Sequence, residues 1–237
     1  MLTKKIMRIA KYISNAGYCS RRDAEKLILS GKVYINDILC EKPNVNVNPN
    51  DKILIEKKLV KLQNNIRLWK LYKPSKIICS NKDPQKRKPI YDILPNDFPR
   101  VISVGRLDFM SEGLLLLTNN GDYARMLELP SSDVLRNYRL CLKGNITTNM
   151  IKQINRNISI NGINYKKISA KIEKFQNPYT WMIFKLKEGK NREIRNICKF
   201  FKWNIIKLIR IQYGTIKLSK QKIGEIQEVK KLPAKLC

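Results

Sequence analysis

Strand and helix patterns follow one another irregularly along most of this chain of 237 residues, and this irregularity restricts the folds open to it. Runs typical of strands occur at residues 68–72, 101–104, 138–142 and 180–186. Helical patterns fall near residues 123–129, 147–155 and 192–201. A parallel sheet would need a regular succession of strand, helix and strand, which is not visible here. The pattern therefore predicts an α+β domain with a mixed, largely antiparallel sheet, and it shows no fixed-period repeat.

The first part of the chain predicts two short helices within residues 6–29. Apolar residues recur there at helical spacing, and Gly17 ends the first helix. Ser20 begins the second helix and has Asp23 three residues later, which is similar to a capping box. Gly31 ends that second helix, so both helices have recognisable limits.

The segments after these helices predict two strands and then a domain boundary. Residues 32–36 and 52–56 alternate like strands, and a loop rich in Asn and Pro separates them. Together with the helices they form an α/β unit of about 55 residues, which is small but large enough to fold alone. Residues 57–65 are polar and basic and predict a linker. We therefore expect one domain at 1–62 and a second at 66–237.

The charge of the chain indicates a polyanionic partner. Lys and Arg number 48 against 19 Asp and Glu, which gives a formal net charge of +29. An alternative is a biased base composition, which would raise the number of lysines without any function. That bias explains neither the shortage of acidic residues nor the 14 arginines. Nucleic acid is therefore favoured over a merely solvated basic surface, and over an anionic membrane, for which no long amphipathic helix is visible.

The absence of histidine excludes many kinds of site. A Ser-His-Asp triad, a Cys-His pair and every His-ligated metal centre are ruled out. The six cysteines are far apart and include no C-x-x-C pair, so we expect reduced thiols and no metal site. The densest apolar run, at residues 114–117, is far too short to span a bilayer. These features predict a cytoplasmic protein.

The stretch from Arg8 to Ile28, followed by residues 31–36, resembles the S4 RNA-binding domain, an αL-like fold. That resemblance implies RNA contacts from Arg8, Ser20, Arg21, Arg22 and Lys32. The physics agrees for Arg21 and Arg22, because the N-terminus of a helix favours phosphate through its free amides and its dipole. The alternative is a solvated charged face.

A second resemblance covers the larger domain. Residues 105–122 read GRLDFMSEGLLLLTNNGD, which resembles the G-R-L-D signature of pseudouridine synthases. Three further segments follow the family's motifs in the same order: LYKP at 71–74, EGKNREIR at 188–195 and LIRIQYG at 208–214. The S4 unit in front indicates the branch that modifies ribosomal RNA, and residues 191–214 look most like the large-subunit type called B.

The pseudouridine synthase resemblance implies a catalytic group. The reaction detaches uracil from C1′ of its ribose, rotates it and rejoins it through C5, which needs one carboxylate and no metal or cofactor. Asp108 stands at the family's catalytic aspartate and would act on either the ribose or the base. The alternative is a salt bridge to Arg106, which would share a face with Asp108 if the segment were a strand.

Other positions of the motifs imply roles around Asp108. Arg195 matches the basic residue that pairs with the aspartate, and Tyr138 matches a tyrosine that stacks on the flipped uracil. Arg106 would fill the gap left by the flipped nucleotide or contact its phosphate. Arg192 and Lys73 are expected to bind RNA. The chain departs from the family's usual residues at Lys76, Ser111, Asn120, Leu129 and Asn196.

The sequence is also compatible with rival functions of four kinds. The first is a non-catalytic ribosome assembly factor that binds rRNA on the same scaffold. The second is a simple RNA-binding protein built on the S4 unit, which leaves the larger domain unexplained. A nuclease or a methyltransferase is disfavoured, because neither an acidic metal cluster nor a G-x-G-x-x-G loop after a strand is visible. The favoured partner is 23S rather than 16S rRNA, free or in a pre-ribosomal particle, bound by a monomer.

Overall fold

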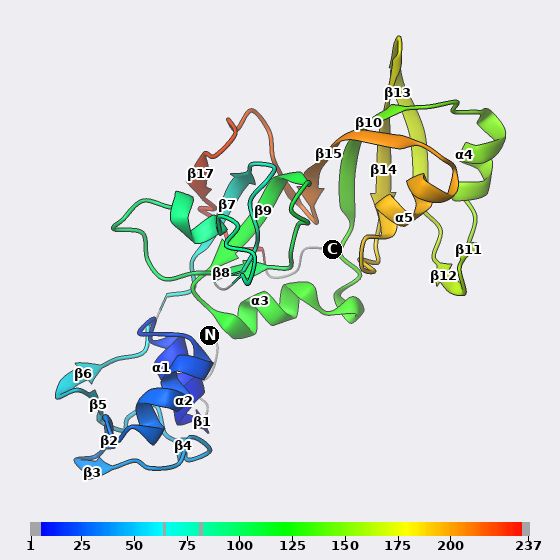
Figure 1. Cartoon of the computed structure of the whole chain (residues 1–237). Coiled ribbons are helices and arrows are strands. Elements are labelled where there is room, and N and C mark those ends of the chain that lie inside the picture. The colour runs from blue at the N-terminus through cyan, green and yellow to red at the C-terminus, as the bar shows by residue number, and fades with distance from the viewer. Residues whose placement is uncertain (1–5, 64, 81–82, 234–237) are drawn as a thin grey trace. The chain divides into compact units, whose positions relative to one another are not determined.

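The computed structural model describes residues 6–63, 65–80 and 83–233 (Figure 1). The chain forms two compact units. The first comprises the residues up to Arg67 together with Asp97–Ile102 and Thr118–Gly121, and the remainder forms the second. The division predicted from the sequence, 1–62 and 66–237, stays a prediction. In the described part of the chain, no helix has both the length and the apolar character needed to cross a membrane.

The first unit combines two helices with short antiparallel strands. A four-stranded sheet has the order β3-β2-β5-β6, and β1 pairs with β4. The elements are β1 (Met7–Arg8), α1 (Ile9–Asn15), α2 (Arg21–Leu29), β2 (Val33–Ile35), β3 (Ile38–Leu39), β4 (Asn46–Val47), β5 (Ile53–Ile55) and β6 (Lys58–Val60). Both helices and the strands at 32–36 and 52–56 lie where the sequence predicts them.

Local side-chain chemistry explains how these helices are placed. The hydroxyl of Ser20 accepts the Asp23 backbone N–H at 3.1 Å and donates to the Asp23 carboxylate at 2.6 Å. This closes the first turn of α2 as the capping pattern predicts. The helices then bury Ile9, Ile13 and Ile28 in a core shared with the strands.

Residues 58–60 differ from the expectation of a linker, because they form the edge strand β6. Glu56 and Lys57 are the two turn residues between β5 and β6, and both have positive φ, at 49° and 66°. That geometry is typical of a two-residue hairpin. The usual sequence signal for such a turn is Asn-Gly or Asp-Gly, and Glu-Lys lacks it, so composition alone indicated a linker.

The second unit is built on one mixed sheet with the strand order β13-β14-β10-β15-β9-β7-β17. Strand β9 pairs with β15 in parallel, and the other registers described in this sheet are antiparallel. The strands are β7 (Leu68–Lys73), β8 (Ile102–Val104), β9 (Glu112–Thr118), β10 (Arg136–Lys143), β13 (Ser169–Gln176), β14 (Tyr179–Leu186), β15 (Asn204–Tyr213), β16 (Ile216–Lys217) and β17 (Ile226–Glu228). This is the α+β architecture that the sequence predicts.

Helices and a hairpin cover one face of this sheet. Helices α4 and α5 share a core with alternate residues of β10 and β14, and both lie beside these strands in Figure 1. The remaining elements are η1 (Ile90–Ile93), α3 (Gly121–Glu128), η2 (Pro130–Ser132), α4 (Thr148–Ile154), β11 (Ile158–Ile160), β12 (Ile163–Tyr165) and α5 (Glu193–Phe200). The three helical patterns predicted from the sequence correspond to α3, α4 and α5.

Strand β9 was not predicted from the sequence. Its four consecutive leucines, Leu114 to Leu117, are all fully buried. A strand that is buried on both faces shows no alternation of apolar and polar residues, so the period-2 signal is absent. The sequence therefore shows an apolar run without revealing its structure.

Gly113 allows β9 to approach β15. Its φ is +102°, and an added Cβ would lie 2.4 Å from the backbone oxygen and 2.8 Å from the backbone nitrogen of Arg210. Arg210 and Gly113 are register partners in the parallel pair. A side chain at this position would therefore force the two central strands apart.

We expect Gly113→Ala to lower the free energy of unfolding by at least about 3 kcal/mol, because backbone strain and a backbone clash add together. Gly162→Ala is the matched control. Gly162 also has positive φ, at +75°, but nothing lies within 4 Å of its added Cβ. Gly162→Ala should lower the free energy of unfolding by only about 1 kcal/mol. Urea unfolding measures both values, and equal losses would contradict the packing argument.

Candidate active site

One pocket in the second unit gathers the residues that the sequence predicts for catalysis. It has a volume of about 280 Å³, and Arg106, Asp108, Tyr138 and Arg195 line it. Arg192, which the sequence predicts to bind RNA, lines it too. These side chains come from the loop before β9, from β10, and from the loop and helix at α5. The pocket is basic, because its lining includes six cationic side chains and three acidic ones. The charged residues are Arg106, Arg136, Lys190, Arg192, Arg195, Arg210, Asp108, Glu128 and Glu193.

Asp108 lies in the loop between β8 and β9, where residues 105–111 have no strand structure. The sequence alternative of a strand with an Arg106–Asp108 salt bridge is therefore wrong. Arg106 is exposed, and the cations that reach the Asp108 carboxylate come from the α5 region instead. The Ser111 backbone N–H donates to the Asp108 carbonyl at 3.0 Å and closes a tight turn around the carboxylate.

Arg195 is the cation nearest to Asp108. Its Nε donates to Asp108 Oδ2 at 3.3 Å, and its Nη2 donates to the hydroxyl of Ser111 at 2.9 Å. Ser111 is buried, so the guanidinium joins α5 to both ends of the Asp108 turn. A charge-assisted pair of this kind fixes the orientation of the carboxylate and compensates its negative charge.

Arg192 lies closer to Asp108 than the sequence indicates. Its Nη1 is 3.7 Å from Asp108 Oδ2, while 55% of its side chain stays exposed. Arg192 precedes α5 and has a left-handed backbone, with φ at 52°. This bend directs the side chain to the rim of the pocket, where it faces both the carboxylate and solvent. The sequence prediction of RNA binding at Arg192 stays a prediction.

The prediction that Lys73 binds RNA needs a correction. Its side chain is 0% exposed. Its Nζ donates to the carbonyl oxygens of Pro74 at 2.9 Å, Ser111 at 2.8 Å and Asp108 at 3.4 Å. Burial lowers the pKa of this ammonium to about 8. Lys73 therefore holds the Asp108 turn from inside the protein and has no free surface for a phosphate.

Tyr138 lies on β10, on the face that packs against the α5 core. Its cross-strand neighbours are Phe184 on β14 and Arg210 on β15. The ring is partly buried and lines the pocket with Asp108. Its stacking on a base stays a prediction.

Two arginines and a tyrosine form a wall of the pocket that the sequence reading did not assign. The guanidinium carbons of Arg136 and Arg210 lie 4.9 Å and 5.1 Å from the centre of the Tyr213 ring. Arg136 also donates to the Tyr213 hydroxyl at 3.2 Å. We call these three residues the arginine–tyrosine wall.

A β-bulge creates this wall. Strand β15 shifts register between Asn137 and Tyr138 of β10, so that Ile211 has no partner across the ladder. Residues three apart on a regular strand point to opposite faces, whereas the extra residue brings Arg210 and Tyr213 to the same pocket. The L-x-R-x-x-Y-G motif contained both residues, but nothing in the sequence showed the bulge.

Glu193 is a further pocket residue without a predicted role. It is 3% exposed at the start of α5, and its Oε2 accepts the Lys190 backbone N–H at 3.1 Å. Its Oε1 has no hydrogen-bond partner among the described residues. Burial, together with the nearby carboxylate of Glu188, raises the pKa of Glu193 to about 7.

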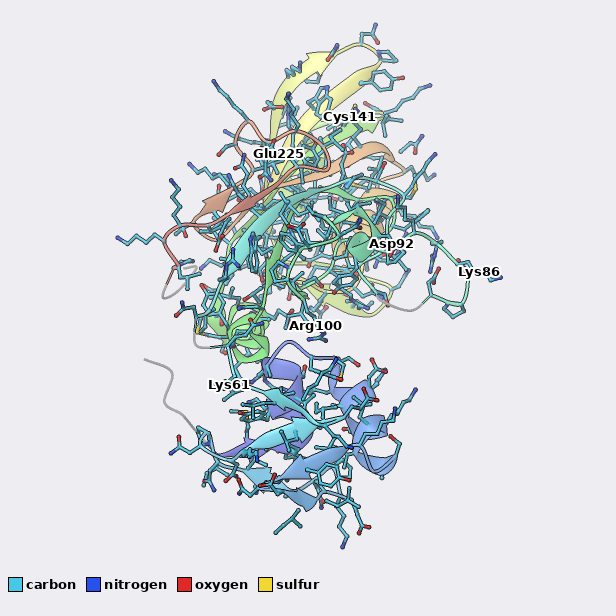
Figure 2. All side chains as sticks on the ribbon, turned by 90° about the vertical axis from the view of Figure 1, so that its left-hand side faces the viewer. Lys61, Lys86, Asp92, Arg100, Cys141 and Glu225 are labelled. Atoms are coloured by element: carbon cyan, nitrogen blue, oxygen red, sulfur yellow. The ribbon has the colours of Figure 1, made fainter. Side chains whose placement is uncertain are left out.

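The predicted RNA-binding residues of the first unit lie mostly on its surface. Arg8, Arg21, Arg22 and Lys32 are exposed, and Lys32 forms an ion pair with Glu56 at 2.6 Å. Ser20 has a structural role as the cap of α2, and its contact with RNA stays a prediction, as do those of the other four. Figure 2 shows long nitrogen-tipped side chains projecting from the surfaces of both units.

Comparison with known proteins agrees with this geometry. Residues 67–200 match the family model described as RNA pseudouridylate synthase, and residues 7–53 match the S4 domain. An uncharacterized RNA pseudouridine synthase of Rickettsia prowazekii is 46% identical over 222 residues, covering 94% of each chain. The ribosomal large subunit pseudouridine synthase B of Buchnera aphidicola from Schizaphis graminum is 37% identical, over 90% of this chain and 86% of its own.

The fold has a solved counterpart. A crystal structure of a pseudouridylate synthase superposes with a TM-score of 0.65 and 23% identity, covering 94% of this chain and 96% of that chain. With a family model that covers more than half of the chain, these findings identify the class. This chain belongs to the RNA pseudouridine synthase family, as an isomerase with an N-terminal S4 RNA-binding domain.

The raised pKa of Glu193 predicts a loss of stability as the pH rises. Between the ordinary value of 4.5 and about 7, the unfolded chain releases this proton while the folded protein keeps it. The free energy of unfolding therefore falls as the pH rises through that window, and it keeps the lower value at higher pH. Glu193→Gln should be more stable than the wild type at pH 8, by at most about 3 kcal/mol, and nearly equal to it at pH 4.5.

Urea unfolding between pH 4.5 and 8 tests this expectation. Glu56→Gln is the matched control, because Glu56 is exposed and its ion pair with Lys32 lowers its pKa. The difference between Glu56→Gln and the wild type should stay constant above pH 5. A similarly constant difference for Glu193→Gln would show that Glu193 is ionised in the folded protein throughout the range.

Proposed function

We propose that this enzyme converts a specific uridine of large-subunit (23S) rRNA to pseudouridine, with Asp108 as the catalytic carboxylate. The observation that carries the proposal is the position of Asp108. Its carboxylate is 34% exposed in a basic pocket, is fixed by Arg195 at 3.3 Å and lies on a turn held by the buried Lys73. A carboxylate in a pocket that must admit an anionic RNA repels phosphate, so its placement there implies a chemical role.

The chemistry follows from the groups around the pocket. The N1–C1′ bond breaks, the base turns, C5 bonds to C1′, and one proton moves from C5 to N1, so that the product is an isomer of the substrate. The Asp108 carboxylate bonds to the ribose or to the base, and this bond breaks again before the product leaves, so that the carboxylate is regenerated. Arg195 and Arg192 compensate its negative charge. Tyr138 stacks on the uracil, and its hydroxyl takes part in the removal of the C5 proton.

The cationic rim explains how the base reaches the pocket. Extruding a nucleotide from an RNA stem costs a few kcal/mol. Arg192 at the rim, together with the exposed Arg106, offsets this cost through contacts with the flanking phosphates, and Arg106 occupies the space that the base leaves. Exposed arginines of the S4 unit add contacts with the RNA backbone, which position the enzyme without reading the sequence.

The substrate assignment rests on the relatives and on the charge of the chain. The Buchnera protein is named as a ribosomal large subunit enzyme, and so is a Bacillus subtilis protein that is 31% identical over 94% of this chain. We therefore favour 23S over 16S rRNA, free or in a pre-ribosomal particle, and a monomeric enzyme that works in the cytoplasm. The alternative is an rRNA-binding assembly factor without activity.

Asp108→Asn should lower the single-turnover rate by about 10³-fold or more, because the amide keeps the shape of the side chain but cannot act as a carboxylate. The assay maps pseudouridine in unmodified 23S and 16S rRNA that have been incubated separately with each protein. Asp92→Asn, at an exposed position of η1, is the control and should keep the wild-type rate.

Each outcome of this assay has a defined meaning. One new pseudouridine in 23S rRNA, formed by the wild type and the control alone, supports the whole proposal. Modification of 16S rRNA instead would overturn the subunit assignment. A fully active Asp108→Asn would exclude the catalytic carboxylate, and tight binding of rRNA or of a precursor particle without any modification would favour the assembly factor.

The proposed RNA contacts of the S4 unit should be measurable in the salt dependence of binding. Replacing Arg21 and Arg22 by Gln should weaken binding to rRNA and flatten its salt dependence by about 0.7–0.9 in log–log slope for each phosphate that is no longer neutralised. The matched control replaces Lys57 and Lys58, two exposed cations of the β5–β6 hairpin, by Gln. Equal changes in both double variants would show that the charge of the unit acts as a whole, and not through the start of α2.

A further inference from the structure

Arg210 carries a hydrogen-bond donor that nothing in the described protein satisfies. Four described residues have buried side-chain atoms without a partner, namely Asn137, Glu193, Arg210 and Gln221. Arg210 and Glu193 line the active-site pocket, and the unpartnered atom of Arg210, its Nη2, is a donor that carries no acceptor function. An unmet donor of this kind in the lining of a pocket indicates a ligand acceptor.

The rest of the Arg210 side chain is held in place. The residue is 2% exposed, and its Nε donates to the Leu114 carbonyl of β9 at 2.7 Å. Its guanidinium stacks on Tyr213, with 5.1 Å between the guanidinium carbon and the ring centre. The Gly113 position brings β9 close enough for the bond to Leu114. The guanidinium is therefore preorganised, which removes the entropic cost of fixing it when a ligand binds.

The charge of Arg210 is also uncompensated within the described residues. Its hydrogen bond goes to a neutral carbonyl, and no described carboxylate forms an ion pair with it. The positive charge of Arg210 also contributes to lowering the pKa of the buried Lys73 ammonium. A buried cation without a counter-charge opposes folding. Its presence beside the catalytic loop is explained if the substrate supplies negative charge there.

We propose that Arg210 is a further substrate-binding residue, whose free Nη2–H group donates to O4 of the extruded uracil. This inference rests on the proposed uridine isomerisation. When the N1–C1′ bond breaks with its electron pair on the base, negative charge spreads over N1, O2 and O4, and the guanidinium stabilises it. Nη2 is closed to bulk water, so the base displaces neighbouring side chains to reach it, and the bond forms without competition from water.

The same contact selects uracil over cytosine. Both bases carry a carbonyl oxygen at C2, but at C4 uracil has an acceptor and cytosine has an amino group, which is a donor. A guanidinium N–H directed at O4 would meet another donor in cytosine, and both groups would be left unpaired. Sites built on such buried polar contacts discriminate by about 10⁴-fold or more.

The test uses a target RNA with a single modified residue at the position mapped for the wild type. Sulfur accepts hydrogen bonds poorly, so 4-thiouridine removes the proposed acceptor and 2-thiouridine removes its counterpart at C2. For the wild-type enzyme, kcat/KM should fall at least 10-fold with 4-thiouridine and change little with 2-thiouridine. Because this comparison of RNAs uses the wild-type enzyme alone, it does not depend on whether any variant folds.

Variants locate the effect at Arg210. Arg210→Met should lower kcat/KM with uridine at least 100-fold and should no longer distinguish uridine from 4-thiouridine, while Arg210→Lys should recover part of the rate. Arg136→Met is the matched control, since Arg136 stacks on the same ring but donates to the carbonyls of Val134 and Lys187. That variant should remain sensitive to 4-thiouridine.

Different failures have different meanings. If the wild type isomerises uridine but treats 4-thiouridine equally well, or responds more to 2-thiouridine, the contact at O4 is wrong. If a folded Arg210→Met stays as sensitive to 4-thiouridine as the wild type, another group binds O4. If the wild type isomerises uridine in no RNA or precursor particle, the proposed function itself fails before this inference is reached.

Discussion

The bond network of Arg195 joins parts of the second unit that lie 84 and 87 residues apart in the chain. One guanidinium from α5 donates to the carboxylate of Asp108 and to the hydroxyl of Ser111. Because a turn between strands is intrinsically free to move, a carboxylate at its tip needs such a cross-chain tie to keep one orientation. The packing of α5 against the sheet core thereby determines where the Asp108 carboxylate lies.

The same turn is held from below by a buried cation. Lys73 donates to three carbonyl oxygens, and these partial charges replace the water that its ammonium has lost. Arg210 is a second buried cation, on β15, which is separated from β7 by β9. It donates to one carbonyl oxygen, and its Nη2 has no partner among the described residues. Arg192 and Arg195 thus contact the carboxylate itself, while the buried Lys73 holds the backbone of its turn. A pocket built in this way attracts an anionic substrate and still keeps Asp108 fixed.

Sequence patterns predicted the parts of this structure that local chemistry determines. The capped helix at Ser20, the helical face of α5 and the grouping of Asp108, Tyr138 and Arg195 in one pocket were all accessible from spacing or from motifs. The buried strand β9, the hairpin at Glu56 and the bulge at Ile211 were not, because tertiary packing and backbone geometry determine them. Lys73 was misassigned for the same reason, since a lysine in a sequence does not show whether its ammonium faces water or three carbonyl groups.

A site without histidine must respond to pH through other groups. Among the described residues, Glu193 has a pKa raised to about 7 and Lys73 a pKa lowered to about 8, both chiefly through burial. Both lie next to the elements that hold Asp108, and both gain negative or lose positive charge as the pH rises. Increasing pH therefore changes the charge of the protein interior beside the Asp108 turn. Any response to pH near neutrality is therefore expected to come from these buried groups that support the Asp108 turn.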